Sequence, residues 1–257
     1  MKITALAENT SCSEQIGLEH GLSLYIETAG HRILFDMGQT ELFARNAELL
    51  GVDLADVDIA VLSHGHYDHG GGMKRFLELN GKAPVYISRR AFEPHYNKEK
   101  YIGLDTSLAE CERLVFTDDE YRIDEGLTLY SCNDRVKPYG FDSAGLSMLK
   151  DGEKIPDDFR HEQYLLIEED SKRVLISGCS HKGILNIVSW FKPDVLVGGF
   201  HFMKLPIGGE LARYAQELDR IPTEYYTCHC TGKEQFDAMQ QHMTRLHYLS
   251  AGESITI

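Results

Sequence analysis

A run of metal-binding residue types at positions 63–72 constrains this chain more than any other feature. The segment reads Ser-His-Gly-His-Tyr-Asp-His-Gly-Gly-Gly and directly follows the apolar run Ile59–Leu62. On a helix, residues two apart face different directions, whereas a strand end followed by a glycine-rich turn can aim four side chains at one point. A loop that is rich in histidine by chance is the alternative, and four ligand types in six residues argue against it. The sequence therefore predicts a metal site formed by His64, His66, Asp68 and His69.

Imidazoles and a carboxylate are ligands that suit zinc, and iron or manganese fits the same set. Two further imidazoles would complete a site for two metals. His181 and His229 are the best candidates, because His181 follows an expected buried strand through a loop of small residues, and His229 lies where a strand end runs into a glycine before a helix. His201 also lies just past a strand and is expected either to support a metal ligand or to face the substrate. His161 is a less certain ligand.

The remaining histidines lack such a setting and are expected on the surface; they are His20, His31, His95, His242 and His247.

Cysteine and aspartate side chains surround the candidate ligands. Cys179 is the cysteine most expected to touch the metals, whereas Cys228 and Cys230 flank His229 on an extended strand and point to the face opposite to it. We expect these two to be small buried residues. Asp36 ends a strand and is expected either to orient a histidine or simply to form a turn.

A strand–turn–strand pattern followed by another apolar strand occurs twice. The expected strands are Leu22–Glu27, Arg32–Phe35 and Asp58–Leu62 in the first half, and Tyr164–Glu168, Arg173–Ile176 and Asp194–Val197 in the second. A weak duplication of this kind predicts two similar β/α halves whose loops meet at a shared edge. Chance similarity between two short units is the alternative.

Composition limits the class of protein. The 257 residues can form one domain spanning 1–257, with lid-like insertions at about 89–124 and 133–163. The formal charge of −14 argues against nucleic acid or an anionic membrane as the main partner and favours a small-molecule substrate. The substrate could still be anionic or phosphorylated, because a pair of metal ions would make the local field positive. With no apolar stretch long enough for a signal peptide or a membrane span, we expect a cytoplasmic protein whose six cysteines are reduced. The sequence gives no indication of the oligomeric state.

The motif His64-x-His66-x-Asp68-His69 resembles the hallmark of the metallo-β-lactamase superfamily. The resemblance covers essentially the whole chain and implies an α/β fold, the four-layer αββα sandwich, with zinc at one edge of the sheets. It also matches Asp36 to the superfamily's early aspartate and His229 to its last histidine. Cys179 stands where a bridging aspartate is usual, and His181 is expected to replace an earlier histidine. These loops resemble a subgroup that includes 7,8-dihydropterin-6-methyl-4-(β-D-ribofuranosyl)aminobenzene 5′-phosphate synthases.

The resemblance implies a hydrolase that uses a metal-bound hydroxide on a small ester, lactone or phosphate-type substrate. One metal would be held by His64, His66 and His181, and the other by Asp68, His69 and His229, with Asp68 and His201 as catalytic residues.

One alternative is a transferase that condenses a dihydropterin diphosphate with an aryl ribofuranosyl phosphate, for which Tyr96, Tyr101 or Phe141 would stack on the pterin. An iron-dependent redox enzyme is a further alternative. It is disfavoured because di-iron members of the superfamily tend to carry a glutamate where this chain has His66.

Overall fold

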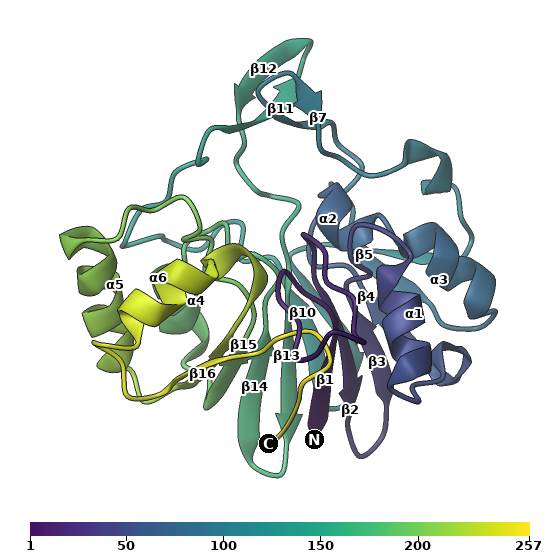
Figure 1. Ribbon diagram of the computed structural model, residues 1–257. Coiled ribbons are helices and arrows are strands. Elements are labelled where there is room, and N and C mark those ends of the chain that lie inside the picture. Colours follow the sequence, from purple (N-terminus) through teal and green to yellow (C-terminus); the bar gives the residue numbers. More distant parts are fainter.

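The computed structural model describes all 257 residues and contains two seven-stranded sheets packed face to face (Figure 1). The strands of the first sheet, in spatial order, are β18 (Ser254–Thr256), β1 (Lys2–Ala7), β2 (Ser23–Glu27), β3 (Arg32–Phe35), β4 (Ile59–Val61), β5 (Val85–Ser88) and β8 (Leu114–Thr117). Those of the second are β17 (Leu246–Tyr248), β16 (Glu224–Thr227), β15 (Val195–Val197), β14 (Lys172–Ile176), β13 (Tyr164–Glu169), β10 (Leu127–Tyr130) and β9 (Glu120–Asp124).

Helices cover the outer face of each sheet, which gives the four layers that the family resemblance implies (Figure 1). On the first sheet lie α1 (Leu42–Leu49), α2 (Tyr67–Gly70) and α3 (Met73–Leu79), and on the second α4 (Ile184–Phe191), α5 (Gly209–Asp219) and α6 (Lys233–Met239). Three short 3-10 helices join these elements; they are Leu54–Asp56, Thr106–Leu108 and His229–Thr231.

Alternating side chains explain why the strands are apolar on both faces. Ile33 and Phe35 of β3 point into the core between the two sheets, whereas Leu34 packs with the helices α1 and α3. In β13, Leu165 likewise faces the space between the sheets, while Leu166 packs against α4–α6. Because successive residues of a strand point to opposite faces, a strand in an inner layer must be apolar throughout.

The predicted duplication is confirmed by the pairing of the strands. In the first sheet β1, β2 and β3 are antiparallel, and β4, β5 and β8 then continue in parallel. In the second sheet β10, β13 and β14 are antiparallel, and β15, β16 and β17 continue in parallel. Both halves therefore send the loops after their parallel strands to one edge of the sandwich.

A small third sheet stands above that edge (Figure 1). Its strands, in spatial order, are β12 (Glu153–Pro156), β11 (Leu146–Lys150), β6 (His95–Asn97) and β7 (Lys100–Tyr101). Each of the two segments expected as insertions supplies two of these strands. The segment 89–124 also contains β8 and β9, which belong to the two main sheets rather than to the small one.

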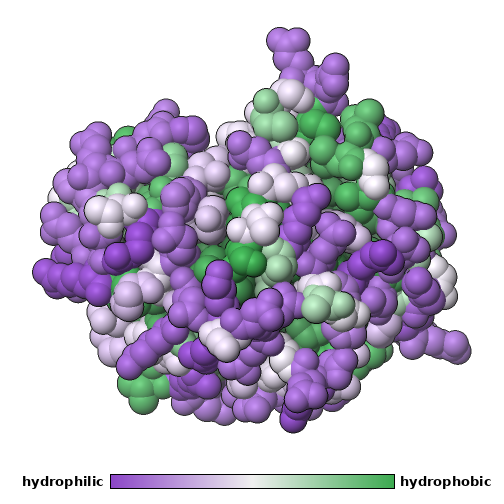
Figure 2. All heavy atoms as spheres, turned by 90° about the horizontal axis from the view of Figure 1, so that it is seen from below, coloured by the Kyte–Doolittle hydropathy of each residue, from purple (hydrophilic) through white to green (hydrophobic).

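The surface is mainly hydrophilic on the face seen from below, with scattered apolar residues (Figure 2). No helix in the structure combines the length and the apolar character needed to cross a membrane.

Truncation of Leu165 tests the core between the sheets. This side chain is fully buried there, so Leu165→Ala should lower the free energy of unfolding by about 2–5 kcal/mol, measured by urea denaturation. Leu49→Ala is the matched control, because Leu49 is 63% exposed and its truncation should change stability by no more than about 0.5 kcal/mol. Equal effects of the two variants would contradict the assigned core.

Candidate metal centre

The loops that follow β4, β14, β15 and β16 bring the candidate ligands to one edge of the sandwich. His64 and His66 follow β4, with His66 in extended backbone, and Asp68 and His69 lie in the short helix α2 that comes next. The glycines of this segment are needed for close packing. A Cβ on Gly65 would lie 2.1 Å from the carbonyl oxygen of Ala91, and one on Gly72 would lie 2.2 Å from that of Met37. Glycine therefore allows the loop to turn directly against the neighbouring backbone.

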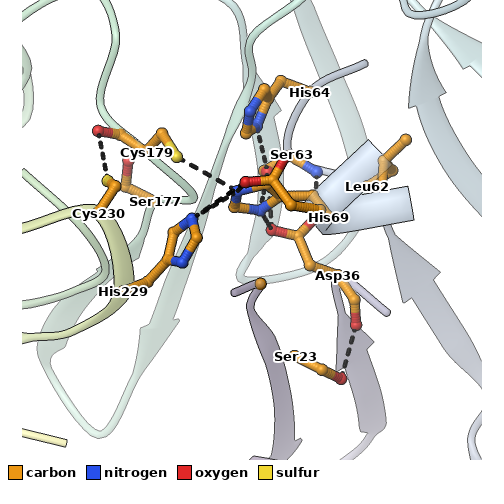
Figure 3. A network of polar contacts seen from close by, with 12 residues as sticks. Ser23, Asp36, Leu62, Ser63, His64, His69, Ser177, Cys179, His229 and Cys230 are labelled. Atoms are coloured by element: carbon orange, nitrogen blue, oxygen red, sulfur yellow. Dashed lines mark hydrogen bonds and ion pairs between the residues drawn. The ribbon is translucent and has the colours of Figure 1, made fainter. Parts of the chain in front are cut away.

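One group of donor atoms gathers around His69. Its Nε2 lies 3.1 Å from Nε2 of His229 and 3.2 Å from Sγ of Cys179. Asp68 Oδ2 lies 3.5 Å from His229 Nε2 and 3.8 Å from His69 Nε2. Figure 3 shows the side chains of His69, Cys179 and His229 converging from different loops. These spacings match the separation of ligand atoms around one tetrahedral metal.

The rings of His64, His66 and His181 form a second group, and the ligand atom of His66 lies in a cluster with those of His95, Asp157 and His161. The ring centroids of His64 and His66 are 4.5 Å apart, and His181 lies 4.9 Å from the first and 5.1 Å from the second. Nε2 of His64, Nε2 of His66 and both ring nitrogens of His181 are buried without a hydrogen-bond partner. Leaving a buried polar atom unpaired costs about 1–3 kcal/mol, so these nitrogens fit a bound cation.

Cys179 lies between the two groups. Its thiol lies within 4.8 Å of ligand atoms of His64 and His181 on one side, and of His69 and His229 on the other. The structure thus places Cys179 among the candidate ligands, in agreement with the sequence. Cys228 and Cys230 are buried as expected, and neither is part of a cluster that could hold a metal.

Asp36 orients His69 directly and His64 through Ser63, in each case at Nδ1 of the ring, so the expected orienting role is confirmed. This fully buried carboxylate accepts hydrogen bonds from Ser63 N, Ser63 Oγ and His69 Nδ1, each 2.7 Å long. Because the Ser63 hydroxyl donates its proton to Asp36, its oxygen accepts from His64 Nδ1 at 2.8 Å. His64 and His69 therefore both carry their proton on Nδ1 and present a bare Nε2, the form that binds metal.

Burial and neighbouring charge act differently on the ring pKa values of these histidines. Burial, together with the other imidazoles, holds the pKa of His64 well below its usual range, and burial does the same for His66 and His181. At His69 burial also lowers the pKa, but Asp36 and Asp68 outweigh it and raise the value above normal. Neutral imidazoles crowded together are suited to a cation, which would take the place of the protons they exclude.

His201 stands beside the two groups rather than within them. Its ring centroid lies 4.3 Å from that of His181, and burial lowers its pKa to about 4. It lines a cavity of about 200 Å³ together with Asp68, His181 and the cations Lys100 and Lys204. A second cavity of about 300 Å³ shares His181, His201 and Lys204 and is lined by aromatic and aliphatic residues such as Phe141 and Tyr214.

His95 is not a surface residue, and this expectation was wrong. The side chain is fully buried under the small sheet, where its Nδ1 lies 2.7 Å from Asp157 Oδ2. His161 joins the same cluster, and its Nδ1 accepts a hydrogen bond of 2.9 Å from the backbone of Gly65. His161 thus supports the ligand loop. The small sheet joins segments about fifty residues apart, and no local pattern in the sequence indicates that pairing.

His20 was expected on the surface and is exposed, but its Nε2 also lies 3.3 Å from Asp68 Oδ2 at the edge of the cavity. His31, His242 and His247 lie at the surface as expected.

Comparisons with known proteins agree with this geometry. A family model described as the metallo-β-lactamase superfamily matches residues 16–202. An uncharacterised protein of Methanocaldococcus jannaschii is 31% identical over 250 residues, which cover 93% of this chain and 94% of the relative. A second protein of the same organism is 28% identical, over 99% of this chain and 96% of that protein. It is named 7,8-dihydropterin-6-methyl-4-(β-D-ribofuranosyl)-aminobenzene-5′-phosphate synthase. The solved structure of Tm1679, described as a metal-dependent hydrolase of the β-lactamase superfamily, is 29% identical with a TM-score of 0.85, over 100% of this chain and 99% of that one.

Proposed function

The chain belongs to the metallo-β-lactamase superfamily, and from this premise we propose that it is a metal-dependent hydrolase with two zinc ions that acts on a small, anionic substrate. The observation that carries the proposal is the pair of donor groups that share Cys179, with buried ring nitrogens lacking any partner in the protein. Two divalent ions held there would lower the pKa of bound water to about 7 and so supply the nucleophile.

The residues have separate roles in this proposal. His64, His66 and His181 would hold one ion, and Asp68, His69 and His229 would hold the other, with the thiol of Cys179 close to both groups. Asp68 Oδ2 lies 3.8 Å from His69 Nε2 and 3.5 Å from His229 Nε2, where it would also orient the attacking water and accept its proton. His201 lies at the junction of the two cavities, where its neutral ring could donate a hydrogen bond to a leaving group.

The cavities support the substrate class. Lys100 and Lys204 bring positive charge to the rim of the site in a protein with a formal charge of −14. An ester, lactone or phosphate-type group would lie at the metals between these cations, and an apolar part of the substrate would extend into the second cavity. Six unpaired cysteines agree with the reducing cytoplasm that we propose as its location.

A transferase is the second candidate, favoured by the relative named as a synthase, which matches almost the full length of both chains. In that case the ions would bind a diphosphate leaving group. Phe141 lines the second cavity and could stack on a pterin, whereas Tyr96 and Tyr101 pack against each other on the small sheet and line neither cavity. Iron-dependent redox chemistry has no comparable support.

Oxygen-18 water distinguishes the two candidates. Zinc-loaded protein is assayed against aryl phosphates, aryl esters and lactones, and separately against a dihydropterin diphosphate with an aryl ribofuranosyl phosphate. A hydrolase should place one water oxygen in its product, lose activity on chelation and regain it with zinc. Release of pyrophosphate with formation of the condensed product, and no water oxygen in the pterin product, would overturn hydrolysis in favour of the transferase.

A further inference from the structure

Asn9 lies in the loop after β1 and contacts both His229 and His20. Its Oδ1 lies 2.8 Å from His229 Nδ1 and 3.3 Å from the backbone nitrogen of Gly21. Its Nδ2 lies 3.2 Å from His20 Nδ1. One amide side chain therefore connects a candidate metal ligand to the exposed histidine at the edge of the cavity.

The backbone of Gly21 fixes the direction of these hydrogen bonds. A peptide N–H can only donate, so the Asn9 atom that faces Gly21 must be the carbonyl oxygen. The same oxygen must accept from His229, which therefore carries its proton on Nδ1 and leaves Nε2 bare.

The amide nitrogen of Asn9 must donate, so His20 Nδ1 carries no proton. The proton of neutral His20 then lies on Nε2, 3.3 Å from Asp68 Oδ2.

We propose that Asn9 is a positioning residue that sets the tautomers of both rings: it gives His229 a bare Nε2 toward the candidate metal centre, and it makes His20 an N–H donor that holds Asp68. The part that concerns His229 as a ligand rests on the proposed function. The part that concerns His20 does not depend on a metal.

Glu8 fixes the backbone next to Asn9 and at His229. This fully buried carboxylate accepts hydrogen bonds from His229 N at 2.5 Å and from the Tyr248 hydroxyl at 2.8 Å, and its other oxygen accepts from Thr10 N at 2.5 Å. His229 has a φ of 50°, a left-handed conformation that needs such support. The amide of Asn9 thus meets His229 in a site that is already fixed by the backbone.

Two variants of Asn9 separate its two roles. Asn9→Asp keeps an acceptor for His229 but removes the donor to His20, so only His20 should change, becoming protonated on Nδ1. Asn9→Leu removes both contacts. Asn97→Asp is the matched control, because it places the same new charge on the wall of the cavity that His20 and His229 line, and no hydrogen bond joins the Asn97 side chain to a histidine.

Long-range proton–nitrogen NMR of histidine-labelled, zinc-loaded protein shows which ring nitrogen is protonated, and His20→Gln assigns the His20 signals. In Asn9→Asp we expect a changed His20 pattern and an unchanged His229 pattern, with neither changed in Asn97→Asp. By chelator competition, the zinc dissociation constant of Asn9→Leu should rise about 10–100-fold, while that of Asn9→Asp stays equal to that of Asn97→Asp.

A wild-type His20 pattern in Asn9→Asp would overturn the proposal, and so would zinc binding by Asn9→Leu as tight as that of the wild type. If wild-type protein bound no zinc, the proposed metal centre would fail, and the His20 pattern would still decide whether Asn9 sets that tautomer.

Discussion

His66→Ala is expected to abolish activity and to release about one metal ion per chain. His66 belongs to the donor group with His64 and His181, and its Nε2 is buried without a partner. Loss of a residue that supports a metal ligand typically costs 10–100-fold in affinity or activity, so loss of a ligand itself should cost at least about 100-fold. Metal content is measured by mass spectrometry of the protein after dialysis, and activity with the substrate found in the oxygen-18 assay.

The matched control is His242→Ala. This substitution removes the same kind of side chain, but at a position that is exposed at the surface. It should retain the wild-type metal content and activity. Circular dichroism and urea denaturation verify that both variants fold. Wild-type metal content and turnover in folded His66→Ala would refute the assignment of His66 to the centre.

The ligand loop could be recognised from sequence because its information is local. Four donors lie within six residues after an apolar strand, and the glycines that permit the close backbone approach are part of the same segment. Asp36 could also be recognised from sequence, because it directly follows β3, the strand that pairs with β4 before the loop. The repeated strand pattern gave the two halves for the same reason, since the alternation of apolar residues is a property of each strand alone.

Supporting residues were missed because they act across long separations in the chain. Asn9 contacts His229 from 220 positions away, and His95 meets Asp157 across 62 positions. In each case the contact depends on how strands are ordered in space: β6 pairs with β11 in the small sheet, and the first loop of the chain reaches the loop after β16. A lone histidine or asparagine carries no local pattern that would indicate such a partner.

Asp36→Asn should weaken zinc binding even though it preserves the shape of the side chain. Oδ1 of Asp36 accepts from Ser63 N, and Oδ2 accepts from Ser63 Oγ and His69 Nδ1. An amide can replace only one of these oxygens, and its NH₂ would then face a donor. If the NH₂ faces Ser63 N, two buried donors meet, which leaves polar groups unpaired at a cost of about 1–3 kcal/mol.

If instead the NH₂ faces His69, the imidazole must accept at Nδ1 and carry its proton on Nε2, where the metal would bind. Both orientations therefore disfavour the ligand-ready state, and the zinc dissociation constant should rise about 10–100-fold, measured by chelator competition. Asp105→Asn is the matched control, since Asp105 accepts a hydrogen bond from Ser107 N in an exposed turn away from the ligand loops. If Asp36→Asn bound zinc as tightly as Asp105→Asn, the carboxylate would not set the tautomer of His69, and the charge of Asp36 would have no role in preparing the site.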